Sequence, residues 1–230
     1  MSAIAGLGSP RIHLRQIGST QTLARELAAA GAPHGTVVTA SEQVAGRGRQ
    51  GRSWSAPAGT SLSSSWVVRD PPGLLSLAAG VAVAEVCGER AMIKWPNDVL
   101  LEGRKVAGIL VEARLQESWA VLGIGINVAI DPLEFPPELR DRAGSLGLTP
   151  NDVEPTLVTL RDELERWIPA GPESILGAVR NRDALLGRPV EWEGGSGTAS
   201  GIDESGRLLV TLGDGVEAKL DAGEVHLSRS

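Results

Sequence analysis

Residues 91–128 read AMIKWPNDVLLEGRKVAGILVEARLQESWAVLGIGINV, and this stretch decides the fold class. It contains four short runs of the apolar and β-branched residues that strands prefer. These runs are 91–95, 98–102, 105–113 and 118–128. The turns between them lie at Pro96-Asn97, Glu102-Gly103 and Gln116-Glu117, and strands joined by turns this short favour antiparallel pairing. The stretch therefore predicts an antiparallel or mixed β-meander.

The sequence around the meander predicts further strands together with helices. We expect strands at 11–18, 36–40 and 60–68, and helices from Ser19-Thr20 to Gly31 and at 74–87, 152–168 and 173–186. The segment 74–87 is almost entirely apolar, which is typical of a buried helix.

The composition changes after residue 186. The runs PVEWE, TASGI, RLLVTL, VEAKL and VHL follow one another between Arg188 and Leu227, separated by Gly, Asp and Ser turns. Short alternating runs of this kind are the pattern of a small barrel. We therefore predict one domain over 1–186 and a small C-terminal domain over 187–230.

The overall composition is that of an ordinary globular protein, with 42% apolar and 22% charged residues in 230. No run approaches the roughly 20 apolar residues that a membrane span needs. The first 16 residues do not have the pattern of a signal peptide. Cys87 is the only cysteine, so no intramolecular disulfide is possible. These features predict a cytoplasmic protein.

The charges argue against one class of partner and draw attention to two lysines. A net charge of −6 argues against general nucleic-acid binding, which depends on neutralised phosphates. Lysine is rare: the 22 basic residues include only Lys94, Lys105 and Lys219. Two of these three lysines lie in the meander, which marks it as a candidate for chemistry.

A glycine-rich, basic segment spans Gln43 to Trp54 and reads QVAGRGRQGRSW. It matches the GxGxxG dinucleotide-binding pattern, but Pro57 and Gly59 disfavour the helix that this fingerprint requires. Three arginines alternate with glycines, and no acid lies among them. Such a segment is either a solvated basic loop or a loop that is mobile until an anion binds, and the close backbone approach that glycine permits favours the second interpretation.

Three motifs in the meander present polar groups at strand ends. Lys94 opens KWPND, in which a Pro-Asn-Asp turn exposes an amide and a carboxylate. Lys105 precedes Val-Ala-Gly, where only small side chains stand, so a ligand or another element can pack closely against that strand. In GIGIN, glycines alternate with isoleucines up to Asn127, which predicts one face of bare backbone. A plain turn and a tightly packed core strand are the alternatives.

Together, the basic loop, two lysines and the Asn/Asp groups suit a site for a polyanion and a carboxylate. Joining a carboxylate to the α-phosphate of ATP brings two negative groups together, and cations with Mg²⁺ must neutralise both. Arginine offers a planar fork to such groups, whereas lysine offers a compact charge.

These motifs, GRGRQGR followed by Trp54, KWPND, RKVAGIL and GIGIN in that order, resemble the signature set of biotin–protein ligases (biotin–[acetyl-CoA-carboxylase] ligases), as does the Ser19-Thr20 pair. The resemblance covers nearly the whole chain. It implies an α+β fold, with a mixed β-sheet catalytic domain flanked by helices, of the class II synthetase-like type, and a small C-terminal SH3-like β-barrel. It also implies a reaction: biotin and MgATP give biotinyl-5′-AMP and pyrophosphate, and biotin then passes to a lysine of a biotin carboxyl carrier domain.

The resemblance assigns residue roles motif by motif. The biotin-binding residues would be Ser19, Thr20, Gln21, Gln43, Arg47, Gly48, Arg49, Lys105 and Gly108. The ATP- or adenylate-binding residues would be Arg52, Trp54, Lys94, Asn97, Asp98 and Asn127. The catalytic residues would be Lys105, Arg49, Lys94 and Asp98, with Lys105 beside the biotin carboxylate and the reacting α-phosphate. Mg²⁺ would bind through the ATP phosphates, without assigned protein ligands, and Trp54 could equally belong to the core.

This chain departs from the family pattern in two places. Gln21 stands where the family commonly has asparagine, so the longer amide could reshape a hydrogen bond to biotin. Some members carry an N-terminal winged helix that binds an operator, but here the first catalytic strand is expected from residue 11. We therefore expect a ligase without repressor activity, with no DNA or membrane partner, as a monomer or homodimer.

Two other functions remain open at this point. A lipoate–protein ligase or octanoyltransferase shares the fold and the acyl-to-lysine chemistry, but GRGRxGR and KWPND belong to the biotin ligases. A non-catalytic biotin or nucleotide sensor is the alternative from another class, and it would release no pyrophosphate from biotin and ATP.

Overall fold

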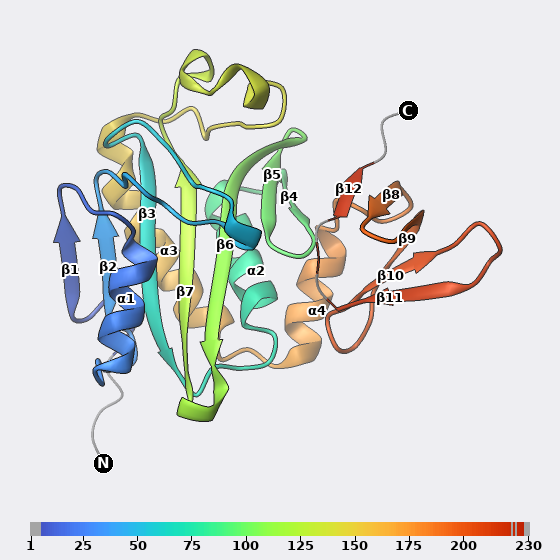
Figure 1. Cartoon of the computed structure of the whole chain (residues 1–230), viewed down its shortest axis with the longest axis horizontal. Coiled ribbons are helices and arrows are strands. Elements are labelled where there is room, and N and C mark those ends of the chain that lie inside the picture. Colours follow the sequence, from blue (N-terminus) through green and yellow to red (C-terminus); the bar gives the residue numbers. More distant parts are fainter. Residues whose placement is uncertain (1–5, 222, 224, 228–230) are drawn as a thin grey trace.

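The computed structural model describes residues 6–221, 223 and 225–227, which form two β-sheets with helices around the larger one (Figure 1). The strands of the larger sheet are β1 (Arg11–Leu14), β2 (Val37–Ala40), β3 (Ser61–Arg69), β4 (Ala91–Lys94), β5 (Asp98–Leu101), β6 (Arg104–Arg114) and β7 (Trp119–Asn127). Their order is β1-β2-β3-β7-β6-β5-β4. β1 and β2 pair in parallel and the other neighbours are antiparallel, which confirms the mixed sheet.

The predicted meander is confirmed as β4 to β7, which lie side by side in sequence order. The turn between β5 and β6 consists of Glu102 and Gly103, whose φ angles are 52° and 78°. Two consecutive residues with positive φ form a hairpin turn whose twist matches that of the flanking strands. The residues of this turn therefore favour antiparallel pairing of β5 with β6.

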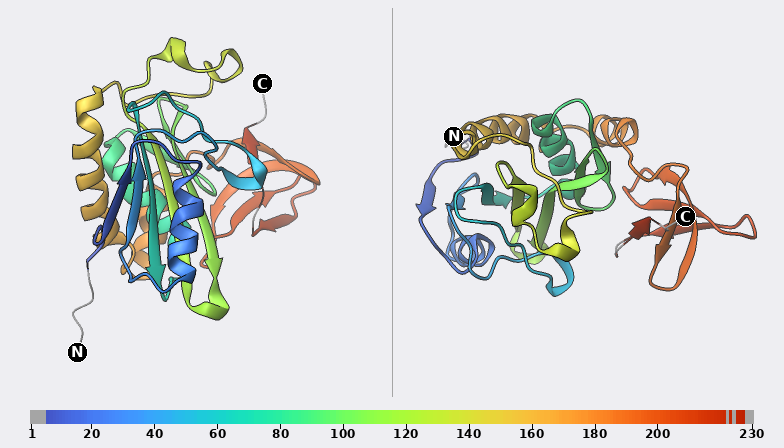
Figure 2. Two further views of the ribbon diagram at one scale, coloured as in Figure 1. Left: turned by 60° about the vertical axis from the view of Figure 1, so that its left-hand side comes forward. Right: turned by 90° about the horizontal axis from the view of Figure 1, so that it is seen from above.

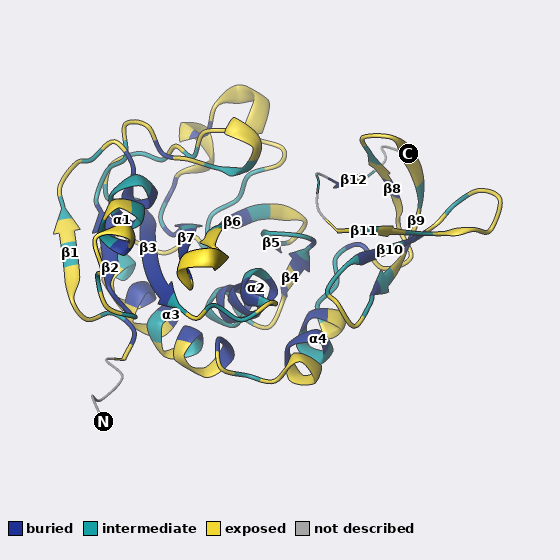
Figure 3. Ribbon diagram, turned by 60° about the horizontal axis from the view of Figure 1, so that its bottom comes forward, coloured by how far each residue is buried: buried dark blue, intermediate teal, exposed yellow. Residues whose placement is uncertain are grey.

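Helices cover both faces of the larger sheet (Figure 2). α1 (Thr20–Ala29) packs on one face, where Ala24 and Ala28 meet Val38 and Val67. The other face carries α2 (Leu75–Cys87), α3 (Val153–Trp167) and α4 (Pro172–Asn181). α2 is buried along most of its length, as Figure 3 shows, and this explains its almost uniformly apolar sequence.

Two ends of elements around the larger sheet differ from the prediction by more than two residues. The first strand ends at Leu14, and only an isolated bridge between Ile17 and Gln43 continues its pairing. The last helix was expected to reach residue 186 but ends at Asn181. Its end is set by β4, because the Ile93 amide donates to the Arg182 carbonyl (2.7 Å) and the Ile93 carbonyl accepts from the Ala184 amide (2.9 Å). Helical periodicity cannot reveal such a long-range pairing.

The small C-terminal sheet is antiparallel, with the order β11-β10-β9-β8-β12. Its strands are β8 (Pro189–Trp192), β9 (Gly195–Ile202), β10 (Leu208–Thr211), β11 (Glu217–Leu220) and β12 (Val225–Leu227). The proposed domain boundary at 186/187 falls between α4 and β8. The apolar core is continuous across this boundary, since Val190, Ile202 and Leu208 belong to the cluster that contains α2.

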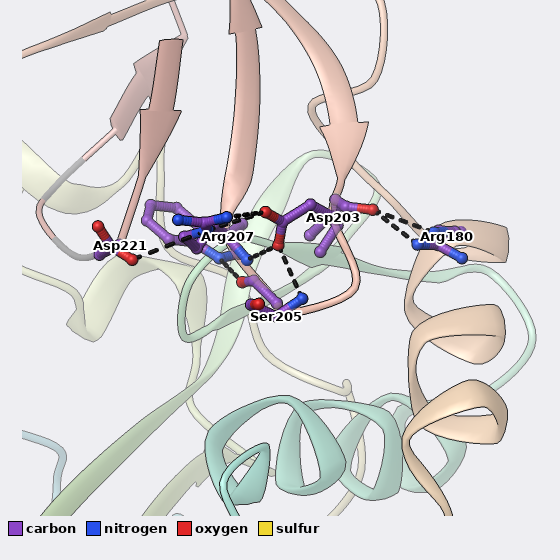
Figure 4. A network of polar contacts seen from close by, with 8 residues as sticks. Arg180, Asp203, Ser205, Arg207 and Asp221 are labelled. Carbon is purple, nitrogen blue, oxygen red and sulfur yellow. Dashed lines mark hydrogen bonds and ion pairs between the residues drawn. The ribbon is translucent and has the colours of Figure 1, made fainter.

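Polar contacts also fasten the small sheet to the larger domain. Arg180 of α4 donates two hydrogen bonds to the Ile202 carbonyl (3.1 and 2.9 Å), and Asp203 with Arg207 closes the turn that follows (Figure 4). The indole of Trp95, in the KWPND motif, donates to the Gly206 carbonyl in the same turn (3.0 Å). The candidate site and the small sheet are therefore physically connected.

Within the ranges described above, no helix is both long and apolar enough to cross a membrane.

Cys87, at the end of α2, should be chemically inert in the folded protein. Burial raises the pKa of its thiol to about 12, although the positive charge of Arg182 acts in the opposite direction. A raised pKa keeps the thiol protonated below that pH, and only the thiolate is a good nucleophile. We expect iodoacetamide at pH 8 to label the native chain at least ~10²-fold more slowly than the urea-unfolded chain. Equal rates in the two states would contradict this burial.

Candidate active site

A cavity lies between the start of α1, the Arg/Gly segment and strands β3, β7 and β6 of the larger sheet. Its volume is about 900 Å³, part of which is open to solvent. Its lining includes Ser19, Thr20, Gln21, Gln43, Arg47, Gly48, Arg49, Arg52, Trp54, Lys94, Asn97, Asp98, Lys105 and Gly108. The structure thus brings together residues from the Ser-Thr pair, the Arg/Gly segment, KWPND and RKVAGIL.

The sequence pattern GIGIN becomes the floor of this cavity. A side chain at Gly123 would place its Cβ 2.4 Å from Gln21 Oε1, and one at Gly125 would place it 2.5 Å from Cε2 of the Trp54 ring. Gly108 on the adjacent strand also faces Trp54, at 3.3 Å. The predicted face of bare backbone is therefore present, and Trp54 and Gln21 lie directly against it.

The α1 end of the cavity is a buried and uncharged polar pocket. Gln43 Oε1 accepts hydrogen bonds from the amide (2.8 Å) and the hydroxyl (3.1 Å) of Thr20. The Ser65 hydroxyl is 2.9 Å from Thr20 Oγ1 and donates to Gln21 Oε1 (3.1 Å). Ser19 Oγ is buried without a partner among the described residues. Such a set of donors and acceptors suits a neutral polar head group such as an amide or a urea.

The Arg/Gly segment forms a tongue, residues 46–54, that folds back on itself over the cavity. The amide of Trp54 donates to the Gly46 carbonyl (3.0 Å), and that of Gly48 donates to the Arg52 carbonyl (2.7 Å). Its tip is a short 3-10 turn, Arg49–Gly51, which lies in front of β6 in Figure 1. The tongue therefore forms one wall of the cavity, to which it contributes Arg47, Arg49 and Arg52.

The opposite end of the cavity is cationic and contains one carboxylate. Lys105 Nζ lies 2.5 Å from Asp98 Oδ1, and Lys94 Nζ lies 3.9 Å from Asp98 Oδ2. Burial lowers the pKa of Lys94; Asp98 raises it, and the nearby charges of Lys105 and Arg52 lower it again. Two lysines with one partner leave positive charge for an anionic ligand.

Arg49 joins this cationic cluster from the tongue. Its Nη1 donates to Asn97 Oδ1 (2.9 Å), and Asn97 Nδ2 in turn donates to the Ile109 carbonyl (3.1 Å). Burial lowers the pKa of Arg49, while Asp98 raises it and Arg52 lowers it. The turn of KWPND thus anchors the tip of the tongue beside Lys94 and Asp98.

Trp54 fills the space between the tongue and the glycine floor. Lys105 Nζ lies 5.9 Å from the centroid of its ring, which is within the range of a cation–π contact. Its indole Nε1 is buried without a hydrogen-bond partner among the described residues. Trp54 therefore belongs to the wall of the cavity and not to the main core.

Asn127 is the one assigned residue outside the described lining of the cavity. It is buried, and its Nδ2 donates to the Gly144 carbonyl (2.8 Å). The Gly144 amide donates to the Lys105 carbonyl (2.8 Å). Asn127 is thus connected to the site through the backbone beside Lys105, and any role in ATP binding stays a proposal.

Sequence reasoning missed several residues of the site. Ser65 and Ser63 of β3 hold the polar pocket, since Ser63 Oγ accepts from Gln43 Nε2 (3.2 Å). The run of serines in a strand flanked by apolar residues was the available signal. Val225 of β12 and Gly223, which precedes this strand, also line the cavity. No local pattern distinguishes them, because their position depends on how the two sheets pack.

The fold and the site define an acyl-activating enzyme, with a neutral polar pocket at one end of a cavity and a cationic cluster at the other. The model of the biotin/lipoate A/B protein ligase family matches residues 13–129, and that of the biotin protein ligase C-terminal domain matches residues 185–228. The chain belongs to the biotin/lipoate A/B protein ligase family.

Individual relatives agree with this assignment. The bifunctional ligase/repressor BirA of Bacillus subtilis is 33% identical, with 96% of this chain and 75% of BirA covered. The biotin–[acetyl-CoA-carboxylase] ligase of Mycobacterium tuberculosis is 39% identical, covering 92% and 87%. Among solved structures, the biotin protein ligase from Aquifex aeolicus in complex with biotin and ATP has a TM-score of 0.80 and 29% identity, covering 96% of this chain and all of that one.

Proposed function

We infer that this protein is a biotin–protein ligase that uses ATP to attach biotin to a lysine of a biotin carboxyl carrier domain of a biotin-dependent carboxylase. One observation carries the inference: the neutral pocket at Ser19–Gln21 and the lysine cluster at Asp98 lie at two ends of the same cavity. A urea head group fits the first end, and a carboxylate beside a triphosphate fits the second.

The first step joins biotin to AMP. A carboxylate oxygen of biotin attacks the α-phosphorus of ATP, the bond to the β-phosphate oxygen breaks, and pyrophosphate leaves. Lys105 and Lys94 neutralise the anions that meet in this step, while Arg49 closes the tongue over them. Asp98 holds the lysines in place and balances part of their charge.

The second step transfers the acyl group. The amine of the carrier lysine attacks the acyl carbon of biotinyl-5′-AMP, the amine loses a proton, and AMP leaves. The tongue must shield the mixed anhydride from water until the carrier arrives, because hydrolysis would waste the adenylate.

The residues of the site fit a magnesium ion that is held mainly by the nucleotide. The described residues contain no group of three or more His, Cys, Asp or Glu side chains arranged to hold a metal. Mg²⁺ commonly binds through one or two carboxylates and substrate phosphates, and Asp98 could supply the carboxylate. The ion would neutralise charge on the phosphates.

The proposal includes a cytoplasmic location, where ATP is available, and a monomeric or homodimeric state. It includes no DNA partner, since the net charge of −6 opposes binding to a polyanion.

The test of this function is calorimetry of biotin binding with and without a non-hydrolysable ATP analogue, with lipoate as the control ligand. We expect biotin to bind and lipoate to give no signal. Pyrophosphate release on adding biotin and ATP then separates an enzyme from a sensor. Binding of lipoate alone would favour the lipoate ligases, and the absence of both bindings would refute the proposal.

Replacing Arg49 with glycine should let biotinyl-AMP escape into solution. The change removes the hydrogen bond to Asn97 and the contact that anchors the tip of the tongue, so the tongue opens more often. We expect release of pre-formed adenylate to be at least ~10-fold faster, since hydrogen bonds to charged groups contribute about 1.5–3 kcal/mol. Filter-binding or chromatographic chase experiments measure this rate, and an unchanged rate would contradict the role assigned to Arg49.

A further inference from the structure

The tongue carries a second anchor, on the side of the cavity away from the lysine cluster. The Arg47 guanidinium meets the carboxylate of Glu112 on β6 at two points, with Nη1 3.3 Å from Oε2 and Nη2 3.1 Å from Oε1. Arg25 of α1 lies 4.0 Å from the same carboxylate. Glu112 therefore links the tongue, β6 and α1.

The position of Glu112 follows from the strand geometry. Alternate residues of a strand face the same side, so Glu112 lies on the same face of β6 as Gly108 and Leu110, both of which line the cavity. Its partner residue on β7 is Val121, whose carbonyl accepts a hydrogen bond from Gln21 (3.3 Å). The Arg47–Glu112 ion pair therefore holds the tongue to β6 near the α1 end of the cavity, where the neutral pocket lies.

We propose that Glu112 is a positioning residue for the proposed ligase reaction: it holds Arg47 and so keeps the tongue closed over the bound acyl adenylate. The two anchors of the tongue then have different tasks. Arg49 reaches inward to the cationic cluster, whereas Arg47 reaches outward to Glu112. The sequence motif treats the two arginines alike, but the structure separates them.

The strength of the Arg47–Glu112 ion pair suits a tongue that must open in every catalytic cycle. The side chains of Arg47 and Glu112 are 40% and 24% exposed. Ion pairs of this exposure contribute about 0–1 kcal/mol, which corresponds to at most a ~5-fold change in the closed population. A much stronger pair would slow the approach of the carrier lysine.

The first test uses substrate. In Glu112→Gln, which keeps the shape and removes the charge, we expect pre-formed biotinyl-AMP to be released ~2- to 5-fold faster. The rate of pyrophosphate release at saturating substrates should change by less than ~2-fold, because Glu112 touches neither reacting group. Arg47→Gln should accelerate release to a similar degree, and the double variant should be no faster than the faster single variant.

The salt dependence of adenylate release distinguishes a role as an ion pair from a merely structural role of Glu112. Raising NaCl from about 50 mM to about 500 mM screens exposed charges, so release by the wild type should accelerate toward the rate of Glu112→Gln, whose own rate should change less. The matched control is Glu102→Gln, which breaks the exposed pair between Arg90 and Glu102 on the β4–β5 side of the sheet. This control should release adenylate at the wild-type rate.

The second test needs no ligand and separates this inference from the proposed function. Trypsin cleaves after Arg49 and Arg52 only when the tongue opens, so cleavage there in the ligand-free protein should be ~2- to 5-fold faster in Glu112→Gln. Mass spectrometry locates the sites, and thermal melting checks that the variant is folded. If the wild type forms no adenylate, the ligase assignment fails, but the cleavage rates still show whether Glu112 keeps the tongue closed. Cleavage and release at wild-type rates in Glu112→Gln would overturn the role of Glu112.

Discussion

Replacing Lys105 with alanine should slow biotinyl-AMP formation by ~10²-fold or more, the scale for removing one preorganised charge from a transition state. Lys105 Nζ lies 2.5 Å from Asp98 and faces the cavity beside Gly108. In the variant, the incoming carboxylate and the α-phosphate would meet with one neutralising charge fewer, and Asp98 would add its own repulsion. The effect should fall on the rate of the chemical step more than on the KM for biotin.

Single-turnover pyrophosphate release measures this effect directly. Lysine is so rare in this chain that Lys219→Ala is a natural control: it removes the same side chain from β11 of the small sheet and should leave the rate unchanged. A Lys105→Ala variant that releases pyrophosphate at a near-normal rate would remove Lys105 from the catalytic residues.

Placing a methyl group on the glycine floor should have an effect of comparable size. In Gly125→Ala the new Cβ would lie 2.5 Å from Cε2 and 2.7 Å from Cζ2 of Trp54, so the indole must move. Trp54 ends the tongue, and moving it displaces the tongue from the cavity. Overpacking typically costs about 1–3 kcal/mol, which predicts a ~5- to 150-fold loss of adenylate formation.

The same pyrophosphate assay, together with thermal melting, distinguishes a local change from a failure to fold. Gly177→Ala is the matched control, because a Cβ at this position of α4 meets nothing within 4 Å. It should keep full activity and slightly stabilise its helix. Full activity of Gly125→Ala would show that the floor tolerates a side chain and that Trp54 has no fixed position.

The sequence predicted the parts of the fold that depend on local chemistry. The β4–β7 meander followed from short turns such as Glu102-Gly103, and buried α2 followed from its uniform apolar character. Residues of KWPND, RKVAGIL and GIGIN line one cavity because all three motifs lie in the meander, although Asn127 is not among the lining residues. The end of α4 was missed because pairing with Ile93, far away in the chain, determines it.

The site itself was predicted less completely at positions that depend on tertiary packing. Ser65 enters the candidate site only because α1 packs on β3 and brings Thr20 and Gln21 within hydrogen-bond distance. Glu112 is an ordinary strand residue until the tongue folds back onto β6. Asn127 shows the converse, since a motif residue of the same family signature is directed at the backbone of Gly144.

The contribution of β12 to the cavity has a consequence for biosynthesis. Ser19 and Val225 line the same cavity, although nearly the whole chain separates them. A ribosome-bound chain can fold its larger sheet early, but the wall formed by Gly223 and Val225 is added only when the last strand has emerged. The cavity is therefore completed only after β12 has been synthesised, and a chain truncated before β12 would expose any adenylate it formed to water.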